Sequence, residues 1–186
     1  WMIVLSGLFS CTKSTTGSEG SVSFVISSDQ YLADITKSNV SDYTTLPGSD
    51  EFVLTISNSA GNAVWRGKAS EWDPATKLMV GEYRVTASYG NIEDEGFNKP
   101  CFEGTQTFTI KNKETSQVTV SASLANTVIK IACTDNLKNY YKDYTFKLAR
   151  NNADIVTFAK GERRAAFIDG YKVTANGTLV TESGAE

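Results

Sequence analysis

The sequence contains no histidine, only three cysteines and three prolines, and no hydrophobic run of the ~20 residues that a membrane-spanning helix needs. Without histidine the chain cannot form a Ser-His-Asp or Cys-His nucleophile, an HExxH zinc site, or an imidazole that moves protons near neutral pH. We therefore predict a protein that is not an enzyme, with no catalytic residues, no metal and no cofactor.

An excess of positive charge is also missing. The chain has 18 Lys and Arg against 21 Asp and Glu, which gives a formal net charge of −3 over 186 residues. Proteins that bind nucleic acid present clustered basic residues to the phosphates, so we expect no nucleic-acid partner. Hydrophobic residues make up 40% of the chain, which is enough to supply the core of one large or two small domains.

The amino end has the layout of a bacterial lipoprotein export signal. Residues 2–10 form a short apolar run, Cys11 follows directly, and residues 12–20 are polar. The run suits the hydrophobic region of a signal peptide, and Leu8 and Ser10 fit the residue preferences before a lipidated cysteine. We interpret residues 1–11 as the remnant of a signal peptide and residues 12–20 as a flexible tether. The alternative is a buried first strand with an incidental cysteine.

Processing of this signal would make Cys11 the acylated amino terminus. One acyl chain anchors a protein only marginally, so the several chains of a bacterial lipoprotein would be needed for stable attachment. We therefore expect a cell-envelope protein that is attached to the outer membrane through its lipid. Attachment to the periplasmic face and attachment to the surface face are both alternatives. Residue 1 is Trp and no Lys or Arg precedes the run, so we also expect that the first residues of the gene product are missing.

Hydrophobic and polar residues alternate along most of the remaining chain, as in β-strands with one buried face. The pattern predicts strands within residues 21–124, including a hairpin whose strands, 52–57 and 63–67, flank a turn rich in Asn, Ser and Gly. Six or seven short strands in about a hundred residues are typical of a β-sandwich. Residues 21–124 are therefore predicted to form an N-terminal sandwich.

A second β-sandwich is predicted for residues 125–186. Leu137, Tyr140 and Tyr141 have helical spacing, so one or two helical turns are expected there. The Asn176-Gly177 pair is a strong signal for a type I′ hairpin turn. Because this segment is much shorter than the ~100 residues of a complete sandwich, we expect it to be incomplete. The fold class is thus all-β, with tandem Ig-like or prealbumin-like sandwiches.

The other two cysteines, Cys101 and Cys133, allow two interpretations. An oxidising compartment would permit a disulfide between them. Cys101 falls in a long connection, however, and Cys133 in an apolar strand of the second predicted sandwich. Two separate small buried hydrophobes are therefore favoured over a pair.

Candidate ligand sites are few. The acidic run Glu93-Asp94-Glu95 could offer oxygen ligands to Ca²⁺, but it lacks the spacing of an EF-hand loop, so a solvated loop is favoured. Exposed aromatic rings can stack on sugars. Trp65 and Trp72 are the candidates for such stacking, since Trp72 lies beside Asp73 and Pro74 in a connection, whereas Tyr83 is expected in the core.

Two segments of the sequence resemble known protein families. Residues 78–87, with Gly81, Tyr83 and Val85 in the pattern LxxGxYxVxA, resemble a strand pair of secreted prealbumin-like and fimbrillin-like sandwiches. Residues 100–110, with the later strand 118–120 and residues 126–128, resemble an uncharacterised lipoprotein family of gut Bacteroidetes. That resemblance implies an N-terminal lipid anchor, tandem β-sandwiches and fimbria-like partners. It implies no site residues, because its motifs are structural.

The sequence thus favours a non-enzymatic, lipid-anchored envelope protein that acts in adhesion, fimbria-like assembly or surface display, with envelope or fimbrial proteins as partners. A carbohydrate-binding or accessory module of a glycan-processing lipoprotein is the alternative, with a glycan as ligand. An enzyme would require that a missing C-terminal portion carries the catalysis.

Overall fold

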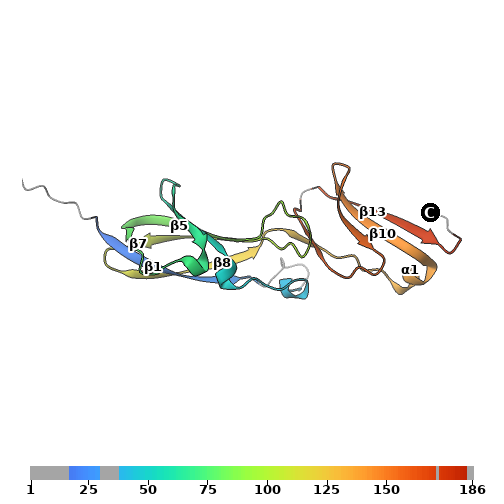
Figure 1. Ribbon diagram of the computed structural model, residues 1–186, viewed down its shortest axis with the longest axis horizontal. Helices are drawn as coiled ribbons and strands as arrows, with labels where there is room; N and C mark the ends of the chain where they lie inside the picture. Colours follow the sequence, from blue (N-terminus) through green and yellow to red (C-terminus); the bar gives the residue numbers. More distant parts are fainter. Residues whose placement is uncertain (1–16, 30–37, 171, 184–186) are drawn as a thin grey trace, which may run out of the picture.

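The computed structural model describes residues 17–29, 38–170 and 172–183, and in these ranges the protein is almost entirely β-structure (Figure 1). The helical elements are short: the α-helix α1 (Asp135–Tyr140) and the 3₁₀ turns η1 (Val40–Asp42), η2 (Ser49–Glu51) and η3 (Ala69–Glu71). The predicted helical turns before residue 142 are confirmed by α1. Thr134 caps this helix, since its hydroxyl accepts the Leu137 N–H.

Seven strands form the first unit, in the order β3-β2-β5-β7-β8-β1-β4. The hairpin predicted within residues 52–67 is confirmed as β2 and β3. Its turn is held by Asn58, whose side-chain oxygen accepts the N–H groups of Ala60 and Asn62. The strands are β1 (Glu19–Ser28), β2 (Val53–Asn58), β3 (Ala63–Lys68), β4 (Leu78–Met79), β5 (Gly81–Tyr89), β7 (Phe102–Ile110) and β8 (Thr115–Leu124).

This sheet folds over on itself between β7 and β8. The two strands pair through only two residue pairs, Phe102 with Leu124 and Glu103 with Ser123. Beyond them β8 runs parallel to β1 over eight residue pairs, while β7 continues antiparallel to β5. The strands of one continuous sheet therefore provide two facing layers.

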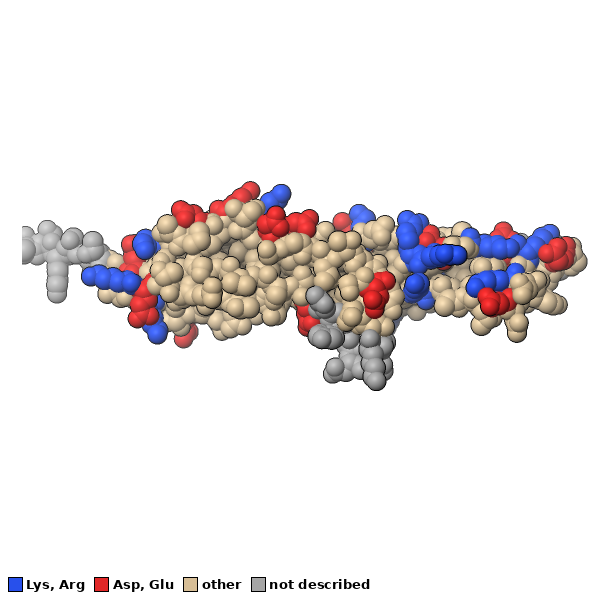
Figure 2. All heavy atoms as spheres, turned by 90° about the horizontal axis from the view of Figure 1, so that it is seen from below, with Lys and Arg blue, Asp and Glu red and all other residues tan. Residues whose placement is uncertain are grey.

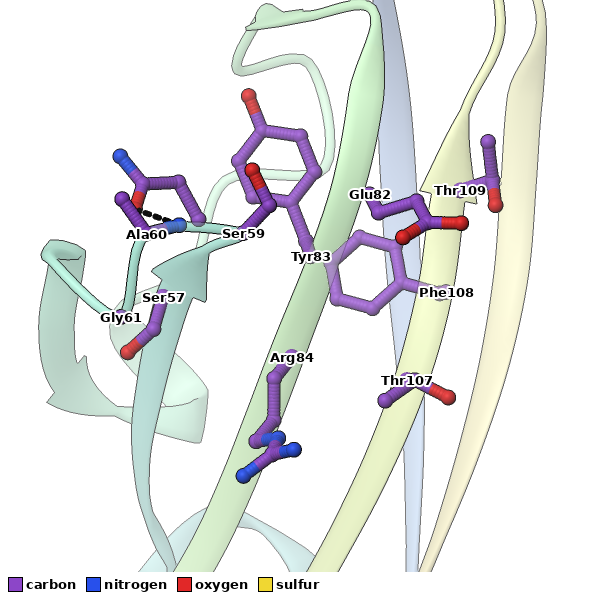
Figure 3. Close-up of a pocket in the computed structure, with 11 residues that line it drawn as sticks. Ser57, Ser59, Ala60, Gly61, Glu82, Tyr83, Arg84, Thr107, Phe108 and Thr109 are labelled. Carbon is purple, nitrogen blue, oxygen red and sulfur yellow. Dashed lines mark hydrogen bonds between the residues drawn. The ribbon is translucent and has the colours of Figure 1, made fainter.

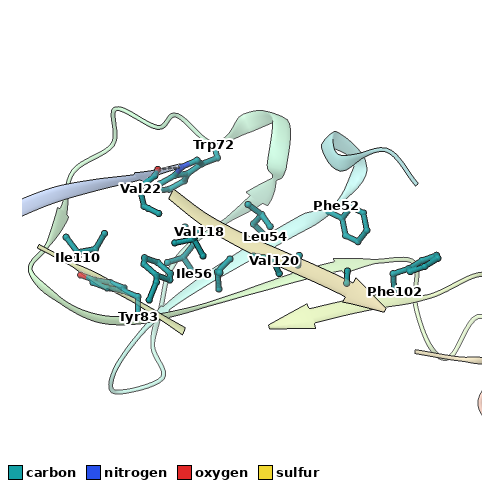
Figure 4. Packing of buried hydrophobic residues seen from close by; sticks show 14 of the residues in the cluster. Val22, Phe52, Leu54, Ile56, Trp72, Tyr83, Phe102, Ile110, Val118 and Val120 are labelled. Atoms are coloured by element: carbon teal, nitrogen blue, oxygen red, sulfur yellow. Dashed lines mark hydrogen bonds between the residues drawn. The ribbon is translucent and has the colours of Figure 1, made fainter. Parts of the chain in front are cut away.

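The inward-facing side chains of these layers form the main hydrophobic core (Figure 4). Val118 and Val120 of β8 lie on one side, and Leu54 and Ile56 of β2 lie on the other. Each of these side chains is at most 7% exposed. Their spacing of two residues is the alternation seen in the sequence, which predicted this buried face correctly.

Two three-stranded sheets form the second unit, in the orders β11-β10-β13 and β6-β12-β9. A second, smaller hydrophobic cluster includes Leu148, Phe158 and Ile168 from both sheets. The strands are β6 (Gly96–Phe97), β9 (Thr127–Ile129), β10 (Tyr141–Arg150), β11 (Ala153–Ala159), β12 (Ala166–Ile168) and β13 (Thr174–Thr181).

The predicted hairpin turn at Asn176-Gly177 is wrong. Both residues lie inside β13, where Asn176 pairs with Lys147 and Gly177 pairs with Phe146 of β10. A Cβ on Gly177 would lie 2.9 Å from Cε1 of the Phe146 ring. The glycine therefore makes room for an aromatic side chain across the strand pair, and a local turn signal is overridden by tertiary packing.

The two units lie end to end, so that the molecule is elongated (Figure 1). Strands β1, β5, β7 and β8 occupy one half, and α1, β10 and β13 occupy the other. The connection between β5 and β7 departs from the sequence-based boundary, because β6 within it pairs with β12. A segment that lies between two strands of the first unit therefore completes a sheet of the second.

Candidate functional site

A pocket lined by polar residues lies on the first unit (Figure 3). Its volume is about 670 Å³, and three elements contribute to it: the β2–β3 turn, the start of β5 and the end of β7. Glu82 pairs with Thr109 across β5 and β7, and Arg84 pairs with Thr107. Directly opposed residues share one face of a sheet, so these four side chains lie on the same surface. We call this the polar pocket.

The polar pocket offers hydrogen-bonding groups without a catalytic arrangement. In the part of the chain that the structure describes, Glu82 is the one carboxylate that lines it, and both Glu82 and Arg84 are exposed. Hydrolysis of a glycosidic bond generally needs two carboxylates that flank the bond. Among the residues that the structure describes, no group of three or more Cys, Asp or Glu could hold a metal ion. The pocket can therefore bind a polar ligand, and its lining residues do not form a known catalytic set.

The prediction for Trp72 is corrected by its position. This residue is only 7% exposed, and its indole N–H donates a 2.9 Å hydrogen bond to the Val22 carbonyl oxygen (Figure 4). The ring also makes edge contacts with Phe24 and Trp65, at centroid distances of 5.5 and 5.1 Å. Because its surface is covered by protein, Trp72 is a core residue and cannot serve as a platform for sugars.

Trp65 is half-buried and packs against the core from the edge strand β3. It does not line the polar pocket, so the structure does not bring the two predicted stacking residues and the pocket together. Its use as a sugar platform stays a prediction. Tyr83, expected in the core, is buried and stacks on Phe108 at a centroid distance of 5.7 Å.

The cysteines take different environments. Cys101 and Cys133 are both free thiols, the first buried and the second half-buried. Burial raises the pKa of the Cys101 thiol, and the nearby Glu103 carboxylate adds to the effect. Cys11, the predicted lipidation site, lies outside the described residues. Among those residues, no helix has the length and hydrophobicity of a membrane span.

The junction between the units contains an ion pair that the sequence did not predict. Both carboxylate oxygens of Glu95 accept hydrogen bonds from the Arg150 guanidinium, at 2.7 and 2.8 Å. The Asp169 N–H donates a further 2.8 Å bond to Glu95, and Arg150 donates to the Asp169 carbonyl oxygen. The side chains of Glu95 and Arg150 are only 14% and 24% exposed. Glu95 is therefore a structural residue, and the expectation of a solvated acidic loop is wrong for it.

Further contacts lie beside this ion pair. We define Glu95, Arg150, Asn126 and the β6–β12 strand pair together as the junction clamp. The Asn126 side chain accepts the Cys101 N–H and donates to the Lys99 carbonyl oxygen. The β6 residue Phe97 packs edge-on against Phe158 of β11, at a centroid distance of 5.2 Å. The clamp thus joins the β5–β7 connection to both sheets of the second unit.

Replacing Glu95 by Gln is expected to lower the midpoint of thermal unfolding by about 5 °C at pH 7. The Arg150 hydrogen bonds hold the pKa of Glu95 below its ordinary value, so the ionised form stabilises the fold. This stabilisation is present above the unfolded pKa near 4.5 and is lost as pH falls through the folded pKa. The gap between wild type and variant should therefore narrow at pH 3. Calorimetry at both pH values measures it.

Glu93→Gln provides the matched control for this experiment. Glu93 lies in the same connection and carries the same charge, but its side chain is exposed. Its replacement should leave the midpoint nearly unchanged. Equal changes in the unfolding midpoint for Glu95→Gln and Glu93→Gln would contradict a stabilising role of the Glu95–Arg150 ion pair. A Glu95→Gln change in the midpoint that is the same at pH 7 and pH 3 would also contradict it.

Sequence reasoning missed Glu95, Arg150 and Asn126 for one reason. Each lies in a different part of the chain, and Glu95 and Arg150 are 55 residues apart. The available signal was a single unusual feature: three consecutive acidic residues inside a long connection between two strands. That feature is equally typical of a solvated loop, so it could not identify the partner.

Comparisons with solved structures find only distant similarity. A candidate polysaccharide-binding protein (DUF1812) of Bacteroides thetaiotaomicron aligns with TM-score 0.44 and 9% identity over 90% of this chain and 73% of its own. A candidate cell adhesion protein of the same species gives 0.43 and 12%, over 88% and 84%. A candidate adhesin of Bacteroides ovatus gives 0.41 and 9%, over 91% and 74%. Similarity at this level carries no argument about function.

Comparison with protein sequences gives a different result. None of the curated proteins matches this chain. A family model described as a domain of unknown function, DUF4493, matches residues 18–186, which include nearly all residues that the structure describes. The chain therefore belongs to the DUF4493 family.

Proposed function

We propose that this protein is a non-enzymatic, lipid-anchored component of the bacterial cell envelope, with a role in adhesion, fimbria-like assembly or surface display. Acylated Cys11 would hold the chain at the outer membrane, and the residues before Glu19, where β1 begins, would connect the lipid to this strand. The β-units would then carry a distal surface away from the lipid. The role is mechanical, since it requires a stable extended body and no chemical step.

The observation that best supports this proposal is the junction clamp. Two end-to-end β-units joined by a simple linker would bend freely. Here a two-point ion pair, a buried amide and a strand pair join them instead. Such a junction suits a spacer that transmits force along its length. The missing histidine and the single carboxylate in the polar pocket also fit a protein without catalysis.

Mass spectrometry of the native polypeptide from its own host tests the anchor. We expect an amino terminus at Cys11 that carries acyl chains, with residues 2–10 removed. The Cys11→Ser variant should then move from the membrane fraction to the soluble fraction with its fold intact. A wild-type chain with an unmodified Cys11 and the apolar run still attached would overturn the proposal. Crosslinking in intact cells would identify envelope partners.

A second candidate function, carbohydrate binding, is favoured by the polar pocket. Sugars are bound through hydroxyl, carboxylate and guanidinium groups near an apolar surface, and Thr107, Thr109, Glu82 and Arg84 supply the polar groups. A glycan array probed with wild type and Arg84→Ala tests this function. Binding that the variant loses would support it, and no binding by wild type would count against it.

A further inference from the structure

The second unit contains a pocket of different character, with aromatic walls and a basic rim. Its volume is about 390 Å³, within the usual range for small-ligand sites. Three aromatic residues of β10 and β11 line it, namely Tyr144, Phe146 and Phe158, and Phe146 is the most exposed of them. Lys130, Lys138 and Arg163 also line it. We call these six residues the basic pocket.

At the basic pocket, the negative charge of the lining residues does not balance the positive charge of the lining Lys and Arg residues. Glu162 is the one carboxylate among the described residues that line it, and both of its oxygens accept hydrogen bonds from Arg164. The same contacts lower the pKa of Glu162 to about 2, and they pair its negative charge with the Arg164 guanidinium. Lys160 adds a further cation beside the pocket, with its Nζ 5.8 Å from the centre of the Tyr144 ring.

Arg163 is the cation most available to a ligand. Its side chain is exposed, and no ion pair or side-chain hydrogen bond is recorded for it within the described ranges. Lys138, by contrast, makes a 3.1 Å ion pair with Asp135, but both side chains are about half or more exposed. An exposed pair of this kind is weak and is easily exchanged for another anion.

This local charge contrasts with the rest of the chain. Residues 21–124 have 8 Lys and Arg against 13 Asp and Glu, whereas residues 125–186 have 9 against 7. Figure 2 shows basic side chains gathered over the half of the molecule that contains the second unit. In a protein whose net charge is −3, a pocket with three lining cations concentrates positive potential at one place.

We propose that the basic pocket binds a carboxylate-bearing sugar, such as a uronic acid residue of an acidic polysaccharide. Arg163 has the planar fork that accepts a carboxylate through two parallel hydrogen bonds. Lys138 adds charge at the rim, and Phe146 offers an apolar surface to the C–H face of the sugar ring. Lys130 also lines the pocket, while its Nζ lies 5.8 Å from the centre of the Tyr43 ring. A simple anion such as phosphate would use the cations but not the aromatic wall.

The place of the pocket also favours a soluble ligand over a lipid headgroup. It is built beside α1, in the half of the molecule away from the start of β1 (Figure 1). If Cys11 carries the anchor, as proposed above, the pocket belongs to the unit farther from that membrane. Only this step depends on the anchor. The assignment of a carboxylated sugar depends on the residues of the pocket itself.

Titration calorimetry of the full chain with trigalacturonate tests the proposal, with methyl-esterified trigalacturonate as the neutral probe. We expect binding of the acid, at least tenfold weaker binding of the ester, and an affinity that falls as salt increases. The double variant R163Q/K138Q should bind the acid at least tenfold more weakly. Lys142→Gln removes one exposed charge from β10 outside the pocket and should have little effect.

Four results would overturn the proposal. The first is absence of trigalacturonate binding, and the second is equal affinity of wild type and R163Q/K138Q at an unchanged unfolding midpoint. The third is loss of binding in Arg84→Ala instead, which would assign the sugar to the polar pocket. The fourth is equally tight binding of inorganic phosphate or of anionic phospholipid vesicles, which would indicate a site for anions in general. An unmodified Cys11 would leave the binding result unchanged, so the two proposals can fail separately.

Discussion

Trp72→Ala is expected to destabilise the protein by about 3–5 kcal/mol. The indole is almost completely covered and contacts both Phe24 and Trp65, so its removal would leave a large cavity in the main core. It would also leave the Val22 carbonyl oxygen without its recorded donor. Val22 lies beyond Glu19 and Gly20, the two residues through which β1 pairs with β4. Urea unfolding followed by circular dichroism measures the change.

Two further variants separate the contributions to this effect. Trp72→Phe keeps most of the apolar volume but loses the indole N–H, and it should cost about 1–3 kcal/mol through the unsatisfied carbonyl group. Tyr140→Ala removes an aromatic ring that is 67% exposed and should change stability by less than about 0.5 kcal/mol. A cost below about 1 kcal/mol for Trp72→Ala would show that the ring does not support the core.

Gly104→Ala is expected to have the next largest effect, about 3 kcal/mol of destabilisation. Gly104 follows the two residue pairs that join β7 to β8, at an inward-facing position of β7. A Cβ there would collide with the Ser121 carbonyl oxygen and would lie 2.8 Å from Ala122 Cα. The backbone of β8 crosses the inner face of β7 at this point, so a single methyl group forces the two layers apart.

The neighbouring position provides the control for Gly104. Glu103 lies on the same strand but is exposed, and Glu103→Ala should change stability by less than about 0.5 kcal/mol. Amide hydrogen exchange gives an independent measurement. In Gly104→Ala, the protection of β8 and of its partner β1 should fall together, because the two strands pair along their length. Unchanged protection from amide hydrogen exchange in β8 and β1 of the Gly104→Ala variant would contradict the close crossing of β8 over β7 at Gly104.

The strands of the first unit were predictable because their signal is local. Val118, Val120 and Ala122 alternate with polar residues, and all three are buried. The same alternation gave the β2–β3 hairpin, whose turn residues include Asn58 and Gly61. Patterns with a period of two depend only on which face of a strand is covered. They do not depend on which strand covers it.

The predictions that were wrong concern residues whose environment depends on distant parts of the chain. Asn176-Gly177 has a strong preference for a turn, but the neighbouring strand places Phe146 against Gly177 and extends β13 through both residues. Trp72 lies next to Asp73 and Pro74, which suggests exposure, but the fold covers its ring. In both cases the deciding contact comes from a residue at least 30 positions away.

The sequence by itself determined the all-β class and most strand positions, because these follow from the spacing of apolar residues along the chain. It also determined the lack of imidazole chemistry, since that follows from composition. Only the tertiary structure decided that β8 runs parallel to β1, that Glu95 meets Arg150, and that three cations surround one pocket. These features depend on contacts between distant segments, and local preferences contain no information about which distant segments meet.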